Sequence, residues 1–339
     1  MCAAPDCEDT RCAKLAIVGD VMLGRLVSRE IASRDPESFW GDTLPLLLGA
    51  DAVLINLECA ISDRGAPWMR TPKVFHFCAA PGAVNVLQAA RVRYVSLANN
   101  HVLDYGEDAL RDTLDLLDDA GITHAGAGET LEQAQQPARF RAKRLAISAF
   151  SLTDNEPPFA ATSERPGTCY VDSDSVSDPW PKADDIAAER AAGADIVVVS
   201  AHLGPNMVTR PSARLRAFKR ALVQAGADII HGHSAHVFQG VEPLGRRVIL
   251  HDTGDFLDDY AVDPLMRNDW SFVFLLDVDP RGIRRLVLRP VVLNFAEVNL
   301  AHGEAFDSIC ERMSEQSKLF GAQLQRCAEG LELRLNGDS

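Results

Sequence analysis

The chain has 339 residues, of which 47% are hydrophobic, so it is long enough to bury one large core. With 48 acidic against 34 basic residues it carries a formal net charge of −14, which argues against a nucleic-acid backbone or an anionic membrane as its main partner. Apolar runs stay shorter than the roughly 18–20 residues of a spanning helix, and the start lacks the basic and apolar segments of a secretory signal. We therefore predict a cytoplasmic protein without stable membrane insertion.

The two ends of the chain are predicted to lie outside the folded domain. Residues 1–13 (MCAAPDCEDTRCA) are polar and show no periodic apolar pattern, which indicates a disordered N-terminal tail. We expect one domain over residues 14–325 and a C-terminal tail over residues 326–339.

Short apolar runs alternate with helical stretches through most of the domain. The runs are continuous rather than alternating, as expected for strands that are covered on both faces. The predicted strands are Leu15–Gly19, Ala52–Leu57, Tyr94–Leu97, Asp195–Ser200 and Asp228–Ile230, and the predicted helices are Gly82–Ala90, Glu107–Ala120, Asp184–Ala192 and Ser212–Ala225. The last three helices end close to Gly121, Gly193 and Gly226, and glycine is a common helix stop.

The pattern changes after residue 245. Arg247–Leu250, Ser271–Asp277 and Ile283–Leu293 follow one another without a helix long enough for a crossover, which favours antiparallel strands. Glu304–Leu319 is then predicted to be a closing helix, whereas residues 151–183, rich in Pro, Ser and Asp, are predicted to form a loop or lid. The fold class is α/β, a sandwich of sheets with flanking helices.

Residues of the types that bind metal ions follow the predicted strands. In open α/β sheets, ligands gather at the carboxyl ends of the strands. Carboxylates, an amide and imidazoles together suit borderline divalent ions such as Mn, Fe or Zn. The strand ends carry Asp20, Glu58, Asn99-Asn100-His101 followed by Asp104, His202, and the run from His231 to His236.

Each of these residues alone is a weak signal. An aspartate after a strand is commonly a helix cap or a turn residue, and a lone buried histidine is commonly a satisfied core residue. The order Asp, Glu, Asn-His, His, Gly-His…His behind successive predicted strands is far more specific, and it predicts a site for one or two divalent ions.

Six longer segments carry a resemblance to a known family. They are GDVMLGR (19–25), NLE (56–58), NNHVLDYG (99–106), AHLGPN (201–206), GHSAHVFQ (232–239) and TGDF (253–256). Together they resemble the CapA family of poly-γ-glutamate (capsule) synthesis proteins, and the match runs from about residue 14 to residue 320. The resemblance implies the calcineurin-like metallophosphoesterase fold, a sandwich of mixed β-sheets flanked by helices.

The resemblance also implies a ligand set. The phosphoesterase blocks are D-x-H, G-D, G-N-H, H and G-H-x-H. Matched to them, the expected metal ligands are Asp20, Glu58, Asn100, His202, His233 and His236. Met22 stands where the histidine of D-x-H is expected, Glu58 replaces an aspartate, and one extra residue separates the last two histidines. One of two metal positions has therefore lost a ligand, and both a single ion and a pair of ions stay open.

His101 is implied to be an acid or electrostatic group that faces the substrate. Asp104 lies three residues on, where it would orient the imidazole and raise its basicity. Alternatively, Asp104 caps the helix that starts near Glu107, and the two roles are compatible.

Other polar residues carry weaker signals. Arg25 and Lys73 are either surface cations or partners for an anionic substrate group. His302, just before the last helix, is either a helix-entry residue or an acid–base group at the mouth of the site. His251 and Asp255 lie four apart on one predicted strand, hence on one face, where Asp255 would support the metal ligands.

Three functions are compatible with these observations. The first is a metal-dependent enzyme that acts on a peptide, a polyglutamate-type amide or a phosphoester. The second is a metal-assisted epimerase of an amino-acid residue in a peptide, with Asp20 and either His302 or His101 as the acid–base pair. The third is a non-catalytic accessory protein of poly-γ-glutamate synthesis. The resemblance points to peptide or polyglutamate-like substrates rather than nucleotides, and the oligomeric state stays open.

Overall fold

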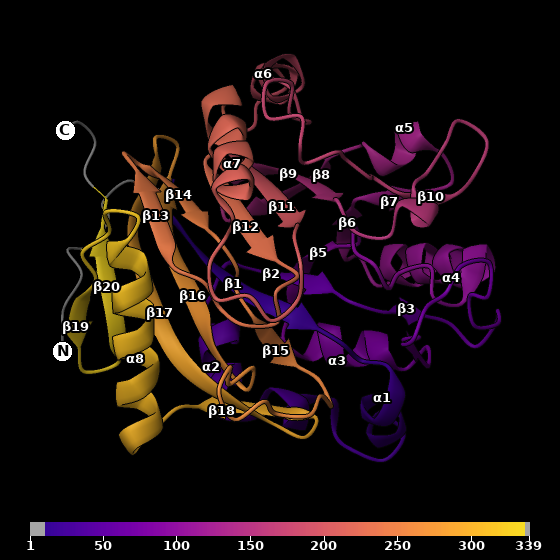
Figure 1. Ribbon diagram of the computed structural model, residues 1–339, viewed down its shortest axis with the longest axis horizontal. Coiled ribbons are helices and arrows are strands. Elements are labelled where there is room, and N and C mark those ends of the chain that lie inside the picture. Colours follow the sequence, from indigo (N-terminus) through magenta and orange to yellow (C-terminus); the bar gives the residue numbers. More distant parts are fainter. Residues whose placement is uncertain (1–10, 336–339) are drawn as a thin grey trace.

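Two stacked β-sheets form the centre of the computed structural model, which describes residues 11–335 (Figure 1). A core between them contains Ile17 and Leu54 of the larger sheet together with Ile147, Val198 and Ile229 of the smaller one. Helices cover the outer faces of both sheets. The mixed α/β sandwich with flanking helices that the sequence predicts is therefore confirmed.

The larger sheet combines a parallel half with an antiparallel half. Strand β1 is parallel to β2 on one side and antiparallel to β16 on the other, and the short β15 continues beside β1 in parallel. In spatial order the sheet contains β19 (Gln325–Cys327), β20 (Gly330–Arg334), β17 (Gly282–Asn294), β16 (Trp270–Asp279), β1 (Ala13–Val21), β2 (Ala52–Leu57), β5 (Val92–Ser96) and β6 (Thr123–Ala125), while β15 (Asp255–Leu257) and β18 (Glu297–Leu300) pair with β1 and β17.

The smaller sheet is parallel at its centre and antiparallel at both edges. Its order is β13 (Val241–Leu244), β14 (Arg247–Leu250), β12 (Ile229–His233), β11 (Ile196–His202), β9 (Leu145–Thr153) and β8 (Ala138–Ala142). Two further pairs are short, and they join β3 (Ala60–Ile61) to β4 (Cys78–Ala79) and β7 (Ala127–Gly128) to β10 (Gly167–Thr168).

Most helices bury apolar residues against the outer faces of the sheets, whereas Ile309, Cys310 and Met313 of α8 join the core between the sheets. Leu215, Phe218 and Leu222 of α7, for example, belong to one apolar cluster with Val197 and Val199 of β11. Figure 1 shows α7 lying over β11 and β12. The helices are α1 (Arg25–Ile31), η1 (Pro36–Thr43), α2 (Leu44–Leu48), α3 (Ala83–Ala89), α4 (Gly106–Asp119), α5 (Leu131–Ala134), η2 (Pro157–Phe159), α6 (Ala183–Ala191), α7 (Ala213–Ala225) and α8 (Gly303–Lys318). Gly226, directly after α7, has a φ of 121°, which explains why a glycine ends this helix.

The predicted strands and helices are present, with ends displaced by a few residues. Residues 151–183 are irregular apart from the end of β9 and two short elements, as the loop prediction requires. Strand β14, however, lies in the smaller sheet, parallel to β12 and antiparallel to β13, so it does not join the antiparallel pair of β16 and β17.

The predicted C-terminal tail, residues 326–339, is wrong over most of its length. Residues 325–334 form β19 and β20, and β20 pairs with β17. The alternation in Leu331-Glu332-Leu333 directs both leucines into the core between the sheets, where they are buried. Of the predicted N-terminal tail, residues 1–10 lie outside the described residues, and Ala13 already belongs to β1.

Within residues 11–335, no helix combines the length and the apolar character needed to cross a lipid bilayer.

Leu331→Ala tests whether the C-terminal strands are integral to the core. Because Leu331 is 1% exposed, the substitution leaves a cavity and lowers the free energy of unfolding by about 2–5 kcal/mol. The matched control is Leu319→Ala, which truncates a side chain that is 50% exposed and shifts stability by no more than about 0.5 kcal/mol. Both values come from urea denaturation, and equal stability of the two variants would contradict the placement of β20.

Candidate metal centre

The carboxyl ends of strands from both sheets meet at one site. Asp20, near the end of β1, lies beside Asn56 of β2 and Asp255 of β15 in the register of the larger sheet. His202 and His233 end β11 and β12 of the smaller sheet, and they are partners in its register. Parallel pairing brings these ends to one edge of each sheet, so the continuous apolar strands themselves deliver the polar residues together.

Asp20, His202 and His233 form the first of two groups with metal-ligand spacing. The Nδ1 atoms of the two histidines are 2.8 Å apart, and His233 Nδ1 is 3.8 Å from Asp20 Oδ1. Burial lowers the pKa of both imidazoles well below the usual value, so both rings are neutral, which is the form that binds metal ions. Two nitrogens that bind one ion at 2.0–2.1 Å lie about 3 Å apart, and the observed separation fits such a pair.

Asp20, Glu58, His236 and Asp255 form the second group. His236 Nδ1 lies 2.7 Å from Asp255 Oδ1 and 3.6 Å from Asp20 Oδ2, while His236 Nε2 lies 3.9 Å from Glu58 Oε1. Asp20 therefore belongs to both groups. Met22, at the position of the missing D-x-H histidine, is fully buried and its Sδ accepts from Gly24 N.

Buried negative charge without hydrogen-bond partners is the observation that fits a cation. Asp20 Oδ2, Asp255 Oδ2 and both carboxylate oxygens of Glu58 are buried and lack a partner among the described residues. Burial raises the pKa of Asp20 to about 7 and, together with the neighbouring Asp20 charge, raises that of Glu58 well above its usual value. Burying such carboxylates is costly unless a counter-charge accompanies them. The donor set therefore fits a bound divalent ion.

Asn56 and Asn99 form a hydrogen-bonded chain that orients Asp20, and Asn100 is a candidate ligand. Asn56 Nδ2 donates to Asp20 Oδ1 at 2.8 Å, and Asn99 Nδ2 donates to Asn56 Oδ1 at 3.1 Å. Asn99 Oδ1 in turn accepts from the backbone of His101, which shapes the loop after β5. Asn100 Oδ1 is buried without a partner among the described residues, so its amide oxygen is free to bind an ion.

His101 is held against the cluster by Asp104. His101 Nδ1 lies 2.5 Å from Asp104 Oδ2, and its Nε2 points to Glu58 Oε1 at 4.0 Å. Phe77 stacks on the imidazole with ring centroids 3.9 Å apart. Burial, followed by the charge of Lys73, lowers the pKa of His101 well below its usual value, so the ring is neutral. Asp104 does not cap α4, because that helix has no side-chain cap hydrogen bond.

Lys73 is a buried part of the site. Its side chain is 7% exposed, and Nζ lies 3.3 Å from Asp104 Oδ1, 3.0 Å from Glu156 Oε2 and 2.7 Å from Asn100 O. The ammonium group thus joins the loop that precedes β4 to the loops after β5 and β9. No spacing signal marks such a residue in the sequence, because its partners come from three separate segments.

His302 is not brought to this cluster. Its side chain is 79% exposed at the N-cap of α8, and its Nε2 lies 3.8 Å from Asp42 Oδ2. The backbone of Ala296 still touches Asp258 near the site, but β18 then leads the chain away from it. The helix-entry role is therefore the one that the geometry supports.

Asp255 and His251 also differ from expectation. His251 lies after β14 and is hydrogen-bonded to Glu242 at 2.9 Å, so it does not share a strand face with Asp255. Asp255 begins β15 and enters the second ligand group itself, rather than only supporting it. Its parallel pairing with Asp20 is a contact between residues far apart in the chain, which the sequence pattern does not reveal.

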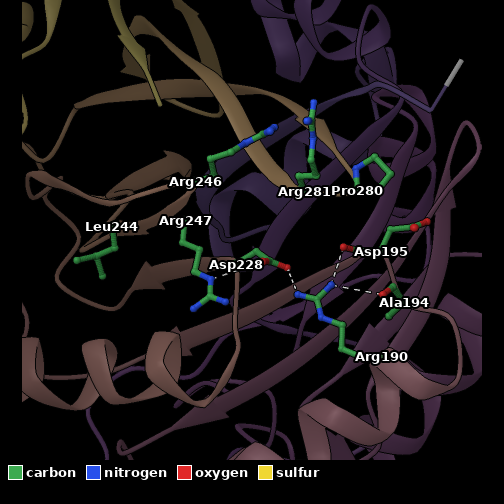
Figure 2. Close-up of a pocket in the computed structure, with 9 residues that line it drawn as sticks. All are labelled: Arg190, Ala194, Asp195, Asp228, Leu244, Arg246, Arg247, Pro280 and Arg281. Atoms are coloured by element: carbon green, nitrogen blue, oxygen red, sulfur yellow. Dashed lines mark hydrogen bonds and ion pairs between the residues drawn. The ribbon is translucent and has the colours of Figure 1, made fainter. Parts of the chain in front are cut away.

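An arginine-lined pocket of about 450 Å³ lies at the opposite edge of the smaller sheet (Figure 2). Asp195 and Asp228 line it just before β11 and β12, whose far ends carry the site histidines. Figure 2 shows the guanidinium group of Arg190 turned toward Asp228 and the backbone oxygens of Ala194 and Asp195. Its charges are engaged within the protein, so we do not regard this pocket as the functional site.

Comparisons with known proteins agree with the motifs. The model of a family described as bacterial capsule synthesis protein PGA_cap matches residues 14–260. The capsule biosynthesis protein CapA of Bacillus anthracis is 30% identical over 289 residues, which cover 82% of this chain and 69% of that protein. A probable polyglutamine synthesis accessory protein of Mycobacterium tuberculosis is 31% identical over 282 residues, which cover 79% of this chain and 73% of that protein. Among solved structures, the sulfate thiohydrolase SoxB of Thermus thermophilus has a TM-score of 0.46 at 13% identity, over 93% of this chain and 61% of that one.

His202→Ala and His233→Ala test the first ligand group. Each change removes an imidazole from the buried cluster, so we expect purified protein to lose most of its divalent metal in elemental analysis. The control is His124→Ala, because His124 is hydrogen-bonded to Asp118 near the surface and should not affect metal content. Full metal occupancy in both site variants would show that these histidines are not ligands.

Proposed function

Because the chain belongs to the bacterial capsule synthesis family PGA_cap, we propose that it is a divalent-metal-dependent enzyme acting on a peptide, a polyglutamate-type amide or a phosphoester. One observation carries the proposal: two groups of buried ligand atoms share Asp20, and Asp20 Oδ2, Asp255 Oδ2 and both oxygens of Glu58 lack hydrogen-bond partners among the described residues. A fold kept only as a scaffold has no need to bury this much unpaired negative charge.

In this proposal the ligands divide between two positions. Asp20, His202 and His233 would hold one ion, with Asn100 as a further candidate ligand, and Asp20, Glu58, His236 and Asp255 would hold the other. Mixed imidazole and carboxylate ligands favour Mn, Fe or Zn. When bound, such an ion polarises a carbonyl or phosphoryl oxygen and lowers the pKa of a coordinated water. In the second group Asp255 would supply a ligand in the absence of a D-x-H histidine.

His101 is the proton-transfer group in this proposal. Its contact with Asp104 places the ring proton on Nδ1 and leaves Nε2 free to take a proton from, or return it to, a reacting group beside Glu58. Lys73 fixes Asp104 from the other side, and Phe77 covers one face of the imidazole and keeps water from it. The pair of His101 and Asp104, the dyad of this site, is therefore oriented before a substrate binds.

The names of the relatives support the proposed substrate class. The names of the relatives refer to capsule biosynthesis and polyglutamine synthesis, which supports a polyglutamate-like or peptide substrate for this chain. A non-catalytic accessory role is the competing proposal, and bound metal without turnover of any substrate would favour it.

Epimerisation of a peptide residue is less well supported by the geometry. The pair of Asp20 and His302 is not assembled, because His302 lies exposed beside Asp42. Asp20 with His101 would be the remaining acid–base pair. Deuterium wash-in at a substrate Cα, without another change of mass, distinguishes this reaction from hydrolysis.

His101→Ala separates proton transfer from metal binding. The variant should keep its metal and its melting temperature, while turnover falls by about 10²–10⁴-fold. Asp104→Asn should give a smaller loss, because it affects only the orientation and basicity of the ring. Turnover is measured on a chromogenic phosphodiester and on γ-linked glutamate oligomers. Loss of metal from the His101 variant would place that residue among the ligands and refute the assignment.

A further inference from the structure

Tyr260 lies between His236, a candidate ligand, and Phe77, which stacks on His101. It follows β15, and its ring meets His236 edge-on with centroids 5.4 Å apart and an interplanar angle of 83°. On the other side, the ring is 5.8 Å from Phe77, which stacks on His101. Tyr260 therefore contacts a candidate ligand and the residue that covers the proton-transfer group.

The hydroxyl group of Tyr260 is buried without a partner. Its Oη has no hydrogen bond to any other described residue. A buried hydroxyl group normally has a partner, because burying it without a hydrogen bond costs free energy. A phenol is protonated at neutral pH, so the hydroxyl group can donate a hydrogen bond.

The fold does pair a buried phenol elsewhere. Tyr94, in the core between the sheets, has its Oη 3.3 Å from Ser200 Oγ and 3.4 Å from Phe150 O. A tyrosine with a purely structural role thus finds acceptors within the protein. The contrast indicates that the acceptor for Tyr260 comes from outside the chain.

The segment that carries Tyr260 is held firmly in place. Asp259 Oδ2 accepts from Leu26 N at 3.0 Å, and its Oδ1 lies 3.4 Å from Arg25 Nε. Asp258 Oδ1 accepts from Tyr260 N at 2.8 Å, which closes a tight turn. The guanidinium carbon of Arg25 also lies 5.9 Å from the centre of the Tyr260 ring. These contacts hold the backbone of the segment and the ring of Tyr260 in place beside His236.

We propose that the Tyr260 hydroxyl donates a hydrogen bond to an oxygen of the substrate group seated beside Asp20, Glu58 and His236, which makes Tyr260 a further catalytic residue. The inference rests on the proposed function, because it needs a substrate at that cluster. No proton changes hands: the O–H bond stays intact, His101 remains the proton-transfer group, and Tyr260 stabilises negative charge that grows on the acceptor oxygen.

Tyr260→Phe tests the inference, because it deletes only the hydroxyl. Wild-type and variant proteins, both loaded with Mn²⁺, are titrated with inorganic phosphate in a calorimeter, and their metal content is measured in parallel. We expect equal metal content and a phosphate affinity that falls about tenfold or more in the variant, as for a lost hydrogen bond to a charged group. The matched control, Tyr94→Phe, deletes a paired hydroxyl and should lower the melting temperature without changing phosphate affinity.

The outcomes separate this inference from the function on which it rests. If wild-type protein holds no divalent metal, the proposed function fails and the role of Tyr260 fails with it. If wild-type protein holds metal but the Tyr260 variant binds phosphate equally tightly, the inference alone is refuted. Loss of metal from the variant would also refute it, because Tyr260 would then be a ligand rather than a donor to the substrate.

Discussion

Three acidic side chains buried between the two sheets set the main electrostatic constraint on this structure. Asp20, Glu58 and Asp255 are buried at the point where the sheets meet, and their repulsion and desolvation oppose folding unless positive charge is present. Although burial of its ring opposes the shift, the charges of Asp255 and Glu58 raise the pKa of His236 well above its usual value. A divalent ion at the cluster would supply positive charge in place of that proton, because only the neutral imidazole binds a metal ion. The residues around the cluster must therefore supply hydrogen bonds or positive charge to these buried carboxyl groups.

The need to balance these buried carboxyl groups also explains which types of residue surround them. The neutral imidazoles of His202 and His233 come from the smaller sheet, whereas Asn100 follows β5 of the larger sheet. Both kinds of side chain offer ligand atoms without adding charge. Lys73 lies farther out, beyond Asp104, so its positive charge acts on the dyad rather than on the carboxylates. Aromatic rings of Phe77 and Tyr260 close the remaining side.

The fold and the central candidate ligands could be predicted because they follow from the pattern of strands. Continuous apolar runs predict parallel strands, and parallel strands predict where Asp20, His202 and His233 converge. Pairings between distant segments leave no such trace, which is why Asp255 was expected only to support the ligands and Tyr260 was not singled out. A single histidine before a helix carries no spacing signal, so the sequence leaves His302 open between a helix-entry role and a place at the mouth of the site. The final strand was missed because its short apolar alternation follows a polar stretch.

Asp20 belongs to one sheet and His202 and His233 to the other, so an ion bound by all three would tie the two layers together. The affinity for the ion then contributes directly to the stability of the fold. An ion that binds only the folded chain raises the free energy of unfolding in proportion to the logarithm of its free concentration, once that concentration is well above the dissociation constant. Chelators would loosen the contact between the layers as well as stop the chemistry. The supply of metal in the surroundings would thus determine how long each molecule survives, and not merely how fast it works.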